Sequence, residues 1–516
     1  MEEQWPGWFA YGETTANSIA ALHVASRIFV TDKYQKMARK RAPDTRADHP
    51  LRILFATSEA VPYFKSGGLA DVARSLPDAL VRRGHDIRIM HPWYSTMRRG
   101  QMRLDPDVQI SVPWAGGPIR IPTLLHQPRG RAAAILLEHP AFTIATSPYE
   151  DTDPAATGRR FALFSRAVLH YAVQWNADVI HLNDWQTGLV PAYALVDGIS
   201  IPTVFSIHNL AYQGVFIPPI LDQVGLPREL FRTENGLEFY GQVSYMKSGL
   251  ALSHRLTTVS PSYAREIQTP EFGAGFDGLL RFRSRDLFGI LNGIDLALWN
   301  PADDDALAQS YDADSLNVKD ALRKSLLEQY GLDAARPLFS VVSRLAHQKG
   351  IDVVLAAVPE LLDAGANLFV LGDGDRALEA QFEELARRFP QRIKAVIGFD
   401  DGLARNLYAG SDFFLMPSRY EPCGLGQMIA QRYGTPPVVR ITGGLRDTVR
   451  DGETGFCFNS PNVADLSEAV RRAIAVWRGS DWDALRRRSM ALDWSWRSSA
   501  VQYEDVYAYA IGPRPD

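Results

Sequence analysis

The arrangement of hydrophobic and polar residues changes regularly along the chain from Leu51 onward. Short aliphatic and β-branched runs alternate with longer stretches of helical spacing, which is the pattern of βαβ units in a parallel sheet. A first series of predicted strands covers residues 51–58, 85–92, 132–139, 178–184, 202–209 and 255–261. A second series covers 337–345, 366–375, 393–400, 412–418 and 436–442. We therefore expect an α/β protein with two Rossmann-like domains in tandem.

The strand pattern is interrupted near residues 293–335. This stretch is acidic, contains proline and is poorly periodic until a helical segment at 318–332, so we interpret it as a connection between domains. The predicted division is an N-terminal extension of unknown role (1–50), a first domain (51–295), the connection (296–335), a second domain (336–490) and a C-terminal helical segment (491–516).

Length, charge and cysteine content narrow the class of protein. A chain of 516 residues is too long for one compact core. Its net charge of −4, from 55 basic and 59 acidic residues, lacks the positive excess of a nucleic-acid-binding protein. No run approaches ~18 consecutive apolar residues, and residues 1–50 lack the apolar core of a signal peptide. Only two cysteines occur, so we expect no disulfide framework and a cytoplasmic enzyme without nucleic-acid or membrane partners.

A lysine and a glycine pair lie between the first predicted strand and a helical stretch, in the sequence YFKSGGLADVARSLPDAL (63–80). Strand, glycine turn and helix in this order can present backbone N–H groups to an anionic ligand. Lys65 precedes Gly67 and Gly68, so the pattern is not a Walker P-loop, in which lysine follows the glycines. The alternative is a tight turn in which glycine only supplies backbone freedom. Lys65 favours an anion site.

Polar residues also follow other predicted strands, at the sheet edge where ligands bind open α/β folds. His208 and Asn209 end one strand and are followed closely by Tyr212 and Gln213. A lone histidine at a strand end is often structural, but the dense polar loop favours a functional role. Asp184 ends the preceding strand and is either a helix cap or part of the same site.

Two cations follow the first strand of the second series. Arg344 as a fork and Lys349 as a point charge can together clamp a diphosphate, and the alternative is solvated surface charge. Glu421 lies in a turn rich in proline and glycine, from which its carboxylate can accept hydrogen bonds from sugar hydroxyls. Cys423 is either a small buried residue or part of a cleft, and it has no adjacent histidine base.

A second glycine pair, Gly443 and Gly444, follows a strand and precedes a helical segment, as the first pair does. The acidic run Asp303–Asp305 is consecutive and has no ligand-like spacing, so no metal site and no cofactor are expected.

Taken together, these motifs resemble those of the bacterial glycogen synthase and plant starch synthase family. The resemblance runs in order from about Leu51 to Ala510. The stretches that carry it are KSGGLADV (65–72), HLNDWQTGLVPAY (181–193), HNLAYQG (208–214), TTVSPSYAREIQTPEFG (257–273), GILNGIDLALWNP (289–301), SRLAHQKG (343–350), SRYEPCGLGQ (418–427) and TGGLRDTV (442–449).

This resemblance implies a GT-B fold, with two facing Rossmann-like domains, an active-site cleft between them and a C-terminal helix that returns to the first domain. It also implies transfer of glucose from ADP-glucose to the non-reducing end of an α-1,4-glucan, with retention of configuration. The first domain is then the acceptor side, and the second binds the nucleotide sugar. The sequence is silent on oligomeric state.

The resemblance assigns roles to individual residues. The implied catalytic set is His208, Lys65, Arg344, Lys349 and Glu421. The implied donor-binding set is Lys65, Gly67, Gly68, Arg344, Lys349, Cys423, Gly424, Thr442, Gly443 and Gly444. Candidate sugar or acceptor residues are Asp184, Asn209, Tyr212 and Gln213.

The mechanism expected from these residues is a same-side substitution. The motifs offer cations and amides that stabilise the departing ADP, rather than the carboxyl pair, ~5–5.5 Å apart, of a retaining glycosidase. Two departures from the family pattern, Gln186 for histidine and Gly426 for threonine, fall near the site. The alternatives are a related enzyme with a UDP-glucose donor or a small saccharide acceptor, and a non-catalytic glucan-binding paralogue.

Overall fold

The computed structural model describes residues 50–98, 100, 102–114, 116–149 and 153–512. Residues Pro50 to Ile511 belong to one compact unit. The predicted N-terminal extension lies outside the described residues except for Pro50. The division of the chain into domains at the boundaries given above stays a prediction.

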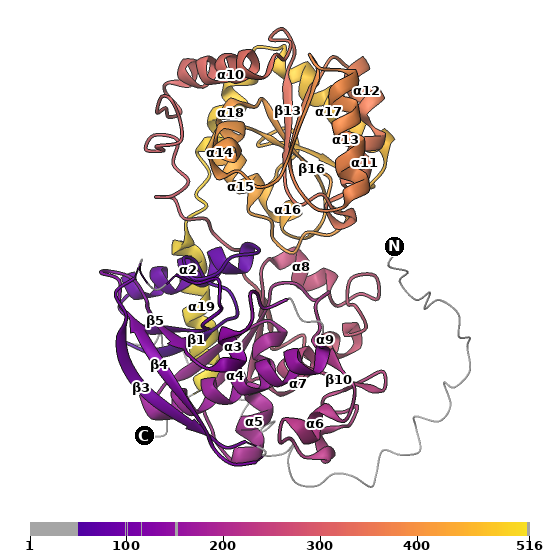
Figure 1. Cartoon of the computed structure of the whole chain (residues 1–516). Coiled ribbons are helices and arrows are strands. Elements are labelled where there is room, and N and C mark those ends of the chain that lie inside the picture. Colours follow the sequence, from indigo (N-terminus) through magenta and orange to yellow (C-terminus); the bar gives the residue numbers. More distant parts are fainter. Residues whose placement is uncertain (1–49, 99, 101, 115, 150–152, 513–516) are drawn as a thin grey trace, which may run out of the picture. The chain divides into compact units, whose positions relative to one another are not determined.

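The first sheet has nine strands in the order β12-β11-β7-β6-β1-β2-β5-β4-β3 (Figure 1). The pairs from β12 to β5 are parallel, and β5, β4 and β3 pair antiparallel at one edge. The strand bounds are β1 (Arg52–Ala56), β2 (Asp86–Pro92), β3 (Asp105–Val112), β4 (Ile119–His126), β5 (Ala133–Leu137), β6 (Val179–Asn183), β7 (Thr203–Ile207), β11 (Arg255–Thr258) and β12 (Leu287–Gly289).

The second sheet has six parallel strands in the order β15-β14-β13-β16-β17-β18. Their bounds are β13 (Leu338–Val342), β14 (Asn367–Gly372), β15 (Ile393–Ile397), β16 (Phe413–Met416), β17 (Pro437–Arg440) and β18 (Phe456–Phe458). A small antiparallel sheet of β8 (Val215–Phe216), β10 (Gln242–Ser244) and β9 (Glu238–Phe239) accompanies the first sheet.

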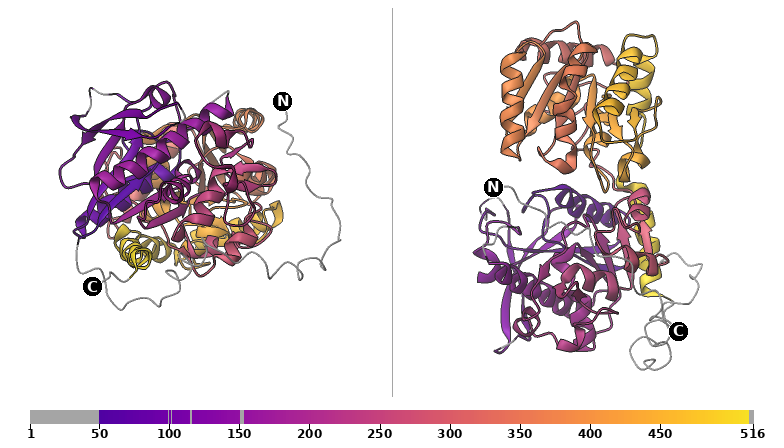
Figure 2. Two further views of the ribbon diagram at one scale, coloured as in Figure 1. Left: turned by 90° about the horizontal axis from the view of Figure 1, so that it is seen from below. Right: turned by 90° about the vertical axis from the view of Figure 1, so that its right-hand side faces the viewer.

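Helices cover both faces of each large sheet (Figure 2). Those before the second sheet are α2 (Gly68–Arg82), α3 (Pro140–Thr143), α4 (Pro154–Trp175), α5 (Val190–Asp197), α6 (Ile220–Gln223), α7 (Tyr245–Leu252), α8 (Pro261–Glu266), α9 (Asp277–Phe282) and α10 (Leu316–Tyr330). The later ones are α11 (Ile351–Ala356), α12 (Val358–Asp363), α13 (Arg376–Arg388), α14 (Asp401–Gly410), α15 (Gly426–Arg432), α16 (Gly443–Thr448), α17 (Val463–Trp477), α18 (Trp482–Met490) and α19 (Trp496–Ile511). Three short 3₁₀ turns are η2 (Trp185–Thr187), η3 (Arg228–Leu230) and η4 (His347–Lys349).

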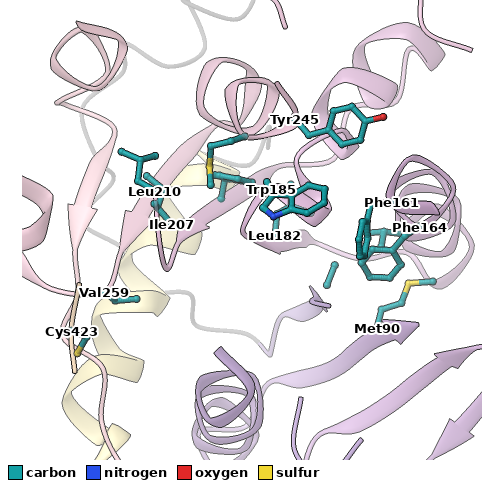
Figure 3. Close-up of a cluster of buried hydrophobic side chains, with 14 of the residues drawn as sticks. Met90, Phe161, Phe164, Leu182, Trp185, Ile207, Leu210, Tyr245, Val259 and Cys423 are labelled. Carbon is teal, nitrogen blue, oxygen red and sulfur yellow. The ribbon is translucent and has the colours of Figure 1, made fainter. Parts of the chain in front are cut away.

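Large apolar side chains fill the space between the first sheet and α4. Phe161 and Phe164 of α4 are fully buried and pack with Trp185 and Tyr245 in the cluster of Figure 3. Burying side chains of this size stabilises by about 1.5–3 kcal/mol each, before conformational entropy is subtracted. The carboxyl ends of β6 and β7 therefore rest on a rigid support.

The last helix, α19, packs against α2 and against strands of the first sheet, including β6 and β7. The Tyr507 hydroxyl of α19 lies 2.7 Å from Nδ1 of His181 in β6, and Glu504 accepts hydrogen bonds from Arg83. The final helical segment thus returns from the second sheet to the first.

The predicted pair of Rossmann-like α/β regions is present, and each of the eleven predicted strands has a counterpart within a few residues. The hairpin of β3 and β4 and the small sheet of β8, β9 and β10 were not predicted. Among the described helices, none has the length and apolar character needed to span a bilayer.

Candidate active site

Three neighbouring strands of the first sheet place the predicted site residues at one edge. In the order β7-β6-β1, the loop after β1 carries Lys65, Asp184 follows β6, and His208 follows β7. Because the strands are parallel, their carboxyl ends lie together, and the three loops are adjacent.

Lys65 is half-exposed, with 46% of its side chain accessible, and its Nζ lies 2.8 Å from Oδ1 of Asp71 in α2. Burial raises the pKa of the Asp71 carboxyl, and Lys65 partly offsets this effect. A Cβ added at Gly67 would have no neighbour within 4 Å, so this turn borders open space. The lysine is thus held by α2 while its amine remains accessible.

The amides of the same turn are bound by a residue that the sequence analysis did not single out. Glu59 is 1% exposed, and its carboxylate accepts hydrogen bonds from the backbone N–H groups of Ser66 at 2.8 Å and Gly67 at 3.1 Å. The hydroxyls of Ser66 and Tyr149 also donate to it. Glu59 lies in the predicted strand-to-turn segment without a recognisable motif, so its function was not evident.

Asp184 and His208 form a buried network with Asn183. The Asp184 carboxylate accepts hydrogen bonds from the backbone N–H groups of His208 at 2.8 Å and Asn209 at 3.4 Å. Burial raises the pKa of Asp184 to about 7, a rise that these two bonds oppose and the charge of Glu59 increases. The carboxyl group therefore titrates near neutral pH.

His208 is a neutral imidazole at neutral pH, because burial lowers its pKa to about 3. Its Nε2 lies 2.8 Å from Oδ1 of Asn183, whose amide nitrogen donates to the Ala56 carbonyl. Because the amide nitrogen of Asn183 is used by Ala56, the Asn183 Oδ1 faces the ring and acts as a hydrogen-bond acceptor. The His208 Nε2 therefore carries the proton and donates it to Oδ1. The ring is thus fixed in one tautomer.

In the second sheet, the cations and the predicted carboxylate lie at neighbouring strand ends, since β13 pairs with β16. Lys349 Nζ lies 2.6 Å from Oε2 of Glu421, and the Ser418 hydroxyl donates to the same oxygen at 3.0 Å. Glu421 is 5% exposed. Arg344 is exposed, and in the described part of the chain its guanidinium forms no ion pair. A free cation therefore lies beside a paired one.

The two turns at residues 421–424 and 442–444 press backbone against backbone. A Cβ at Gly443, which has φ +45°, would lie 1.9 Å from the Glu421 carbonyl oxygen, and one at Gly444 would lie 2.3 Å from that of Cys423. Gly444 N–H donates to the Glu421 carbonyl at 3.0 Å. Only glycine fits at these positions, and the pair fixes the turn that carries Glu421.

The Gly443 N–H donates to Glu266 at 2.8 Å, and the Thr442 hydroxyl is 3.4 Å from the same carboxylate. In this structure the amides of Gly67, Gly443 and Gly444 all bond to protein oxygens, and their part in donor binding stays a prediction. Gly424, with φ +74°, packs against Gln427. Cys423 is buried, and burial raises the pKa of its thiol to about 12, so it is no nucleophile.

Two of the candidate acceptor residues after β7, Tyr212 and Gln213, line a pocket of about 350 Å³ together with Tyr149 and Trp185. Tyr212 is half-exposed, and its ring contacts that of Tyr149, with the two ring centroids 6.5 Å apart. The Gln213 amide donates to the Ala274 carbonyl at 2.7 Å. Asn209 is partly exposed, and its Oδ1 accepts a hydrogen bond from the Ala211 N–H at 3.1 Å.

The two departures from the family pattern are both enclosed. Gln186 is 1% exposed in η2, and its Oε1 has no hydrogen-bond partner among the described residues. A Cβ at Gly426 would lie 3.0 Å from the Phe414 ring and 3.4 Å from the Tyr408 hydroxyl. The Phe414 and Tyr408 side chains thus occupy the space that a larger side chain at position 426 would need.

Within the described ranges, no group of three or more histidine, cysteine, aspartate or glutamate side chains is arranged to hold a metal ion.

Residues 52–282 match a family described as the starch synthase catalytic domain, and residues 323–481 match one described as glycosyl transferases group 1. A glycogen synthase of Anaeromyxobacter dehalogenans (strain 2CP-C) is 46% identical over 476 residues, which cover 89% of this chain and 99% of that relative. A glycogen synthase of Syntrophotalea carbinolica is 43% identical over 480 residues, with the same coverage of each chain.

Solved structures give the same result. The catalytic domain of starch synthase IV from Arabidopsis thaliana, solved with ADP and acarbose, has a TM-score of 0.82 and 32% identity, and the match covers 90% of this chain and 100% of that one. A sucrose-phosphate synthase from Thermosynechococcus elongatus, at 21% identity and a TM-score of 0.58, shares the fold.

Two Rossmann-like sheets with charged loops at their strand ends define a glycosyltransferase of the GT-B fold. More narrowly, the chain belongs to the glycogen synthase and starch synthase family. It is an enzyme of this kind, and both the resemblance drawn from the motifs and the expected fold are confirmed.

Proposed function

We propose that this enzyme transfers glucose from ADP-glucose to the non-reducing end of an α-1,4-glucan, with retention at the anomeric carbon. The observation that carries the proposal is the pairing of Lys349 with the buried carboxylate of Glu421 beside the exposed Arg344. Cations suit a diphosphate, and a buried carboxylate with free acceptor capacity suits sugar hydroxyls. The starch synthase IV structure, which contains ADP and acarbose, supports an adenine nucleotide and a glucan-like ligand.

In the proposed donor site, Lys65 acts from the first sheet, and Arg344 and Lys349 act from the second. Lys65 and Arg344 are the two with accessible charge. The glucose hydroxyls bind Glu421 and the backbone of the turn through Cys423 and Gly424. The turns at Gly67, Gly68, Gly443 and Gly444, together with Thr442, complete the proposed donor site, with Glu59 and Glu266 holding the two turns in place.

The proposed acceptor site is the pocket lined by Tyr149, Tyr212 and Trp185. Its aromatic walls and the Gln213 side chain suit a sugar ring, which has apolar faces and a polar rim. Asp184 and Asn209 follow β6 and β7 next to His208, at the same sheet edge as the loop that lines the pocket. An α-1,4-glucan chain end fits this combination better than a phosphorylated acceptor, because Asp184 and Glu59 add negative charge.

The proposed chemistry is a same-side substitution. The bond from the anomeric carbon to the β-phosphate oxygen breaks, and the 4-hydroxyl oxygen of the acceptor bonds to that carbon on the same face. The hydroxyl proton passes to the departing phosphate. Lys65, Arg344 and Lys349 stabilise the negative charge that develops on ADP. The neutral His208 adds no positive charge beside the electron-poor anomeric carbon, and its carbonyl can face that carbon.

Recognition of the base is assigned to the loop after β15. Phe399 is 81% exposed there, so its ring is free to stack on adenine, whereas Tyr408 is 5% exposed and packs in the core. We therefore favour Phe399 over Tyr408 for this role.

A cytoplasmic location is part of the same proposal. Both cysteines, Cys423 and Cys457, are buried free thiols, which suits a reducing compartment. Nucleotide sugars and glucan must meet in the same compartment for the transfer to occur.

The experiment that tests the proposal measures incorporation of labelled glucose from ADP-glucose or UDP-glucose, with and without glycogen. We expect polymer-bound label from ADP-glucose only when glycogen is present, and Phe399→Ala should raise the KM for ADP-glucose. Preference for UDP-glucose would overturn the donor assignment, and transfer to a small saccharide alone would overturn the acceptor. No transfer from either donor would support a non-catalytic glucan-binding paralogue.

A further inference from the structure

Glu59 joins two segments that border different parts of the active site. Its Oε2 accepts hydrogen bonds from the N–H groups of Ser66 at 2.8 Å and Gly67 at 3.1 Å, and its Oε1 accepts from the Ser66 hydroxyl at 2.8 Å and from the Tyr149 hydroxyl. Each carboxylate oxygen thus has two donors. The carboxylate is also 1% exposed, so the protein supplies the bonds that water would otherwise make.

The two segments differ in what they present to the substrates. Ser66 and Gly67 adjoin Lys65, the donor-site cation of the first sheet. Tyr149 is 47% exposed and lines the acceptor pocket with Tyr212, while its hydroxyl reaches the buried carboxylate. The Glu59 side chain therefore bonds both to the turn that follows Lys65 and to Tyr149 in the wall of the acceptor pocket.

We infer that Glu59 is a positioning residue for the transfer, one that fixes the Lys65 turn and the Tyr149 ring relative to each other. Hydrogen bonds to an ionised acceptor are about twice as strong as neutral ones and hold their donors in place. With both oxygens occupied by protein donors, Glu59 acts on the substrates through Ser66, Gly67 and Tyr149 rather than by contact. The substrate names in this inference rest on the proposed function.

If the Glu59 carboxylate had only a structural role, its loss would lower Tm and leave the KM values for both substrates unchanged. A positioning carboxylate acts on both, because losing it frees both segments. Single variants separate the two effects. Ser66→Ala removes one hydrogen bond between Glu59 and the turn of the nucleotide-sugar site, and Tyr149→Phe removes only the hydrogen bond between Glu59 and the acceptor pocket.

The test is a set of KM values for ADP-glucose and for glycogen, measured separately, with Tm for each variant. Glu59→Gln keeps the volume but removes the charge and one acceptor oxygen, and we expect both KM values to rise about tenfold. Ser66→Ala should raise the KM for ADP-glucose, and Tyr149→Phe the KM for glycogen, each about threefold or more. The double variant Glu59→Gln/Tyr149→Phe should raise the glycogen KM by less than the product of the two single effects, since Glu59→Gln already weakens the bond that Tyr149→Phe removes.

Two matched controls remove the same chemical groups elsewhere. Tyr63→Phe removes a buried hydroxyl that lies 2.6 Å from Nδ1 of His126, and Glu504→Gln removes a carboxylate that binds Arg83 and His85. Both should change Tm while leaving the two KM values within twofold.

The inference is overturned if Glu59→Gln changes Tm alone, or if the glycogen KM effects of Glu59→Gln and Tyr149→Phe multiply in full. If Glu59→Gln does not fold, Ser66→Ala and Tyr149→Phe decide the question, and unchanged constants in both overturn it. If the wild type transfers no glucose from either donor, the proposed function fails separately. Calorimetric titration of wild type and Ser66→Ala with ADP then still tests the donor arm, and equal affinities contradict it.

Discussion

Asp184 has φ +55° and ψ −177°, a backbone conformation that glycine adopts readily and that costs other residues about 1–3 kcal/mol. The N–H groups of His208 and Asn209 bond to its carboxylate and hold the residue in this position. Strain of this kind persists where the surrounding structure determines the conformation, and it often occurs at functional sites. The carboxylate is therefore directed by the backbone of two neighbouring strand ends rather than by its own preferred geometry.

The raised pKa of Asp184 predicts a pH dependence of activity. Burial and the nearby Glu59 charge raise this pKa to about 7, against the bonds from His208 and Asn209, so the carboxylate form increases as pH rises through neutrality. We expect kcat/KM for ADP-glucose to rise between about pH 6 and pH 8, with that limb absent in Asp184→Asn. A profile that is flat in the wild type, or identical in the variant, would contradict the assignment.

The same shift has an effect on stability whose sign is opposite to that of a salt-bridged acid. The folded state binds the Asp184 proton more tightly than the unfolded state, so this contribution is full below about pH 4 and is lost as pH rises through about 7. The Asn variant, which has no such proton, should therefore gain Tm relative to the wild type on going from pH 5 to pH 8.

Glu421 depends on Lys349 for a partner. The two side chains are mostly buried and 2.6 Å apart, and removing the lysine leaves a buried carboxylate without its charge partner. We predict that Lys349→Met and Glu421→Gln each lower kcat/KM by about a hundredfold or more, the usual loss for one preorganised electrostatic contact. Lys324→Ala, which breaks an exposed pair with Glu328, is the control and should keep wild-type kinetics. Wild-type turnover in either active-site variant would show that this pair is not part of the site.

At the scale of elements, the turn that carries Glu421 is shaped by the first residues of α16. Gly443 has a positive φ, and its missing Cβ leaves room for the Glu421 carbonyl. The turn and the helix are therefore joined backbone to backbone, and the position of the Glu421 carboxylate depends on α16.

Gly443→Ala tests this close approach. We expect a loss of about 3 kcal/mol or more of unfolding free energy and a severe fall in kcat, because the new methyl group would overlap the Glu421 backbone. Gly452→Ala is the matched control, since Gly452 also has positive φ, at +73°, but open space around it. That variant should lose only about 1–2 kcal/mol and keep its kcat. Equal losses in the two variants, measured by denaturant unfolding, would exclude the contact as the cause.

Sequence patterns predicted the elements unevenly. Strands such as β6 and β7 are buried on both faces, so they appear as continuous apolar runs between helical stretches. The edge strand β3 and its neighbour β4 mix buried and exposed residues and contain prolines, and β8 and β9 have only two residues each. Their pairing depends on tertiary contacts that short segments do not encode in their periodicity.

The placement of a candidate site residue can be derived from the sequence where its motif follows a strand. Lys65, His208, Arg344 and Glu421 all lie after parallel strands, so their position at the sheet edges follows from the topology. Glu59 could not be found in this way, because its role depends on hydrogen bonds to a turn seven residues on and to Tyr149, 90 residues on. Contacts of this range appear only once the chain is folded.

At the scale of the whole molecule, the two glycine turns are held in the same way, each by a hydrogen bond to a glutamate carboxylate. Glu59 binds the Gly67 N–H just before α2, and Glu266 binds the N–H of Gly443, the first residue of α16. Ser262 donates to Asp447 as well, so α8 and α16 are joined by several bonds. Each sheet thus presents its glycine turn already ordered by a carboxylate.

The central claim is that residues after strands of both sheets act on one nucleotide sugar. Lys65 tests it most directly, because it is the proposed donor-site cation of the first sheet and its side chain is accessible. The measurement is the rate of glucose incorporation from ADP-glucose into glycogen by Lys65→Ala, with Tm recorded alongside. The account predicts a fall of about a hundredfold at unchanged Tm. Wild-type incorporation by this variant would contradict it.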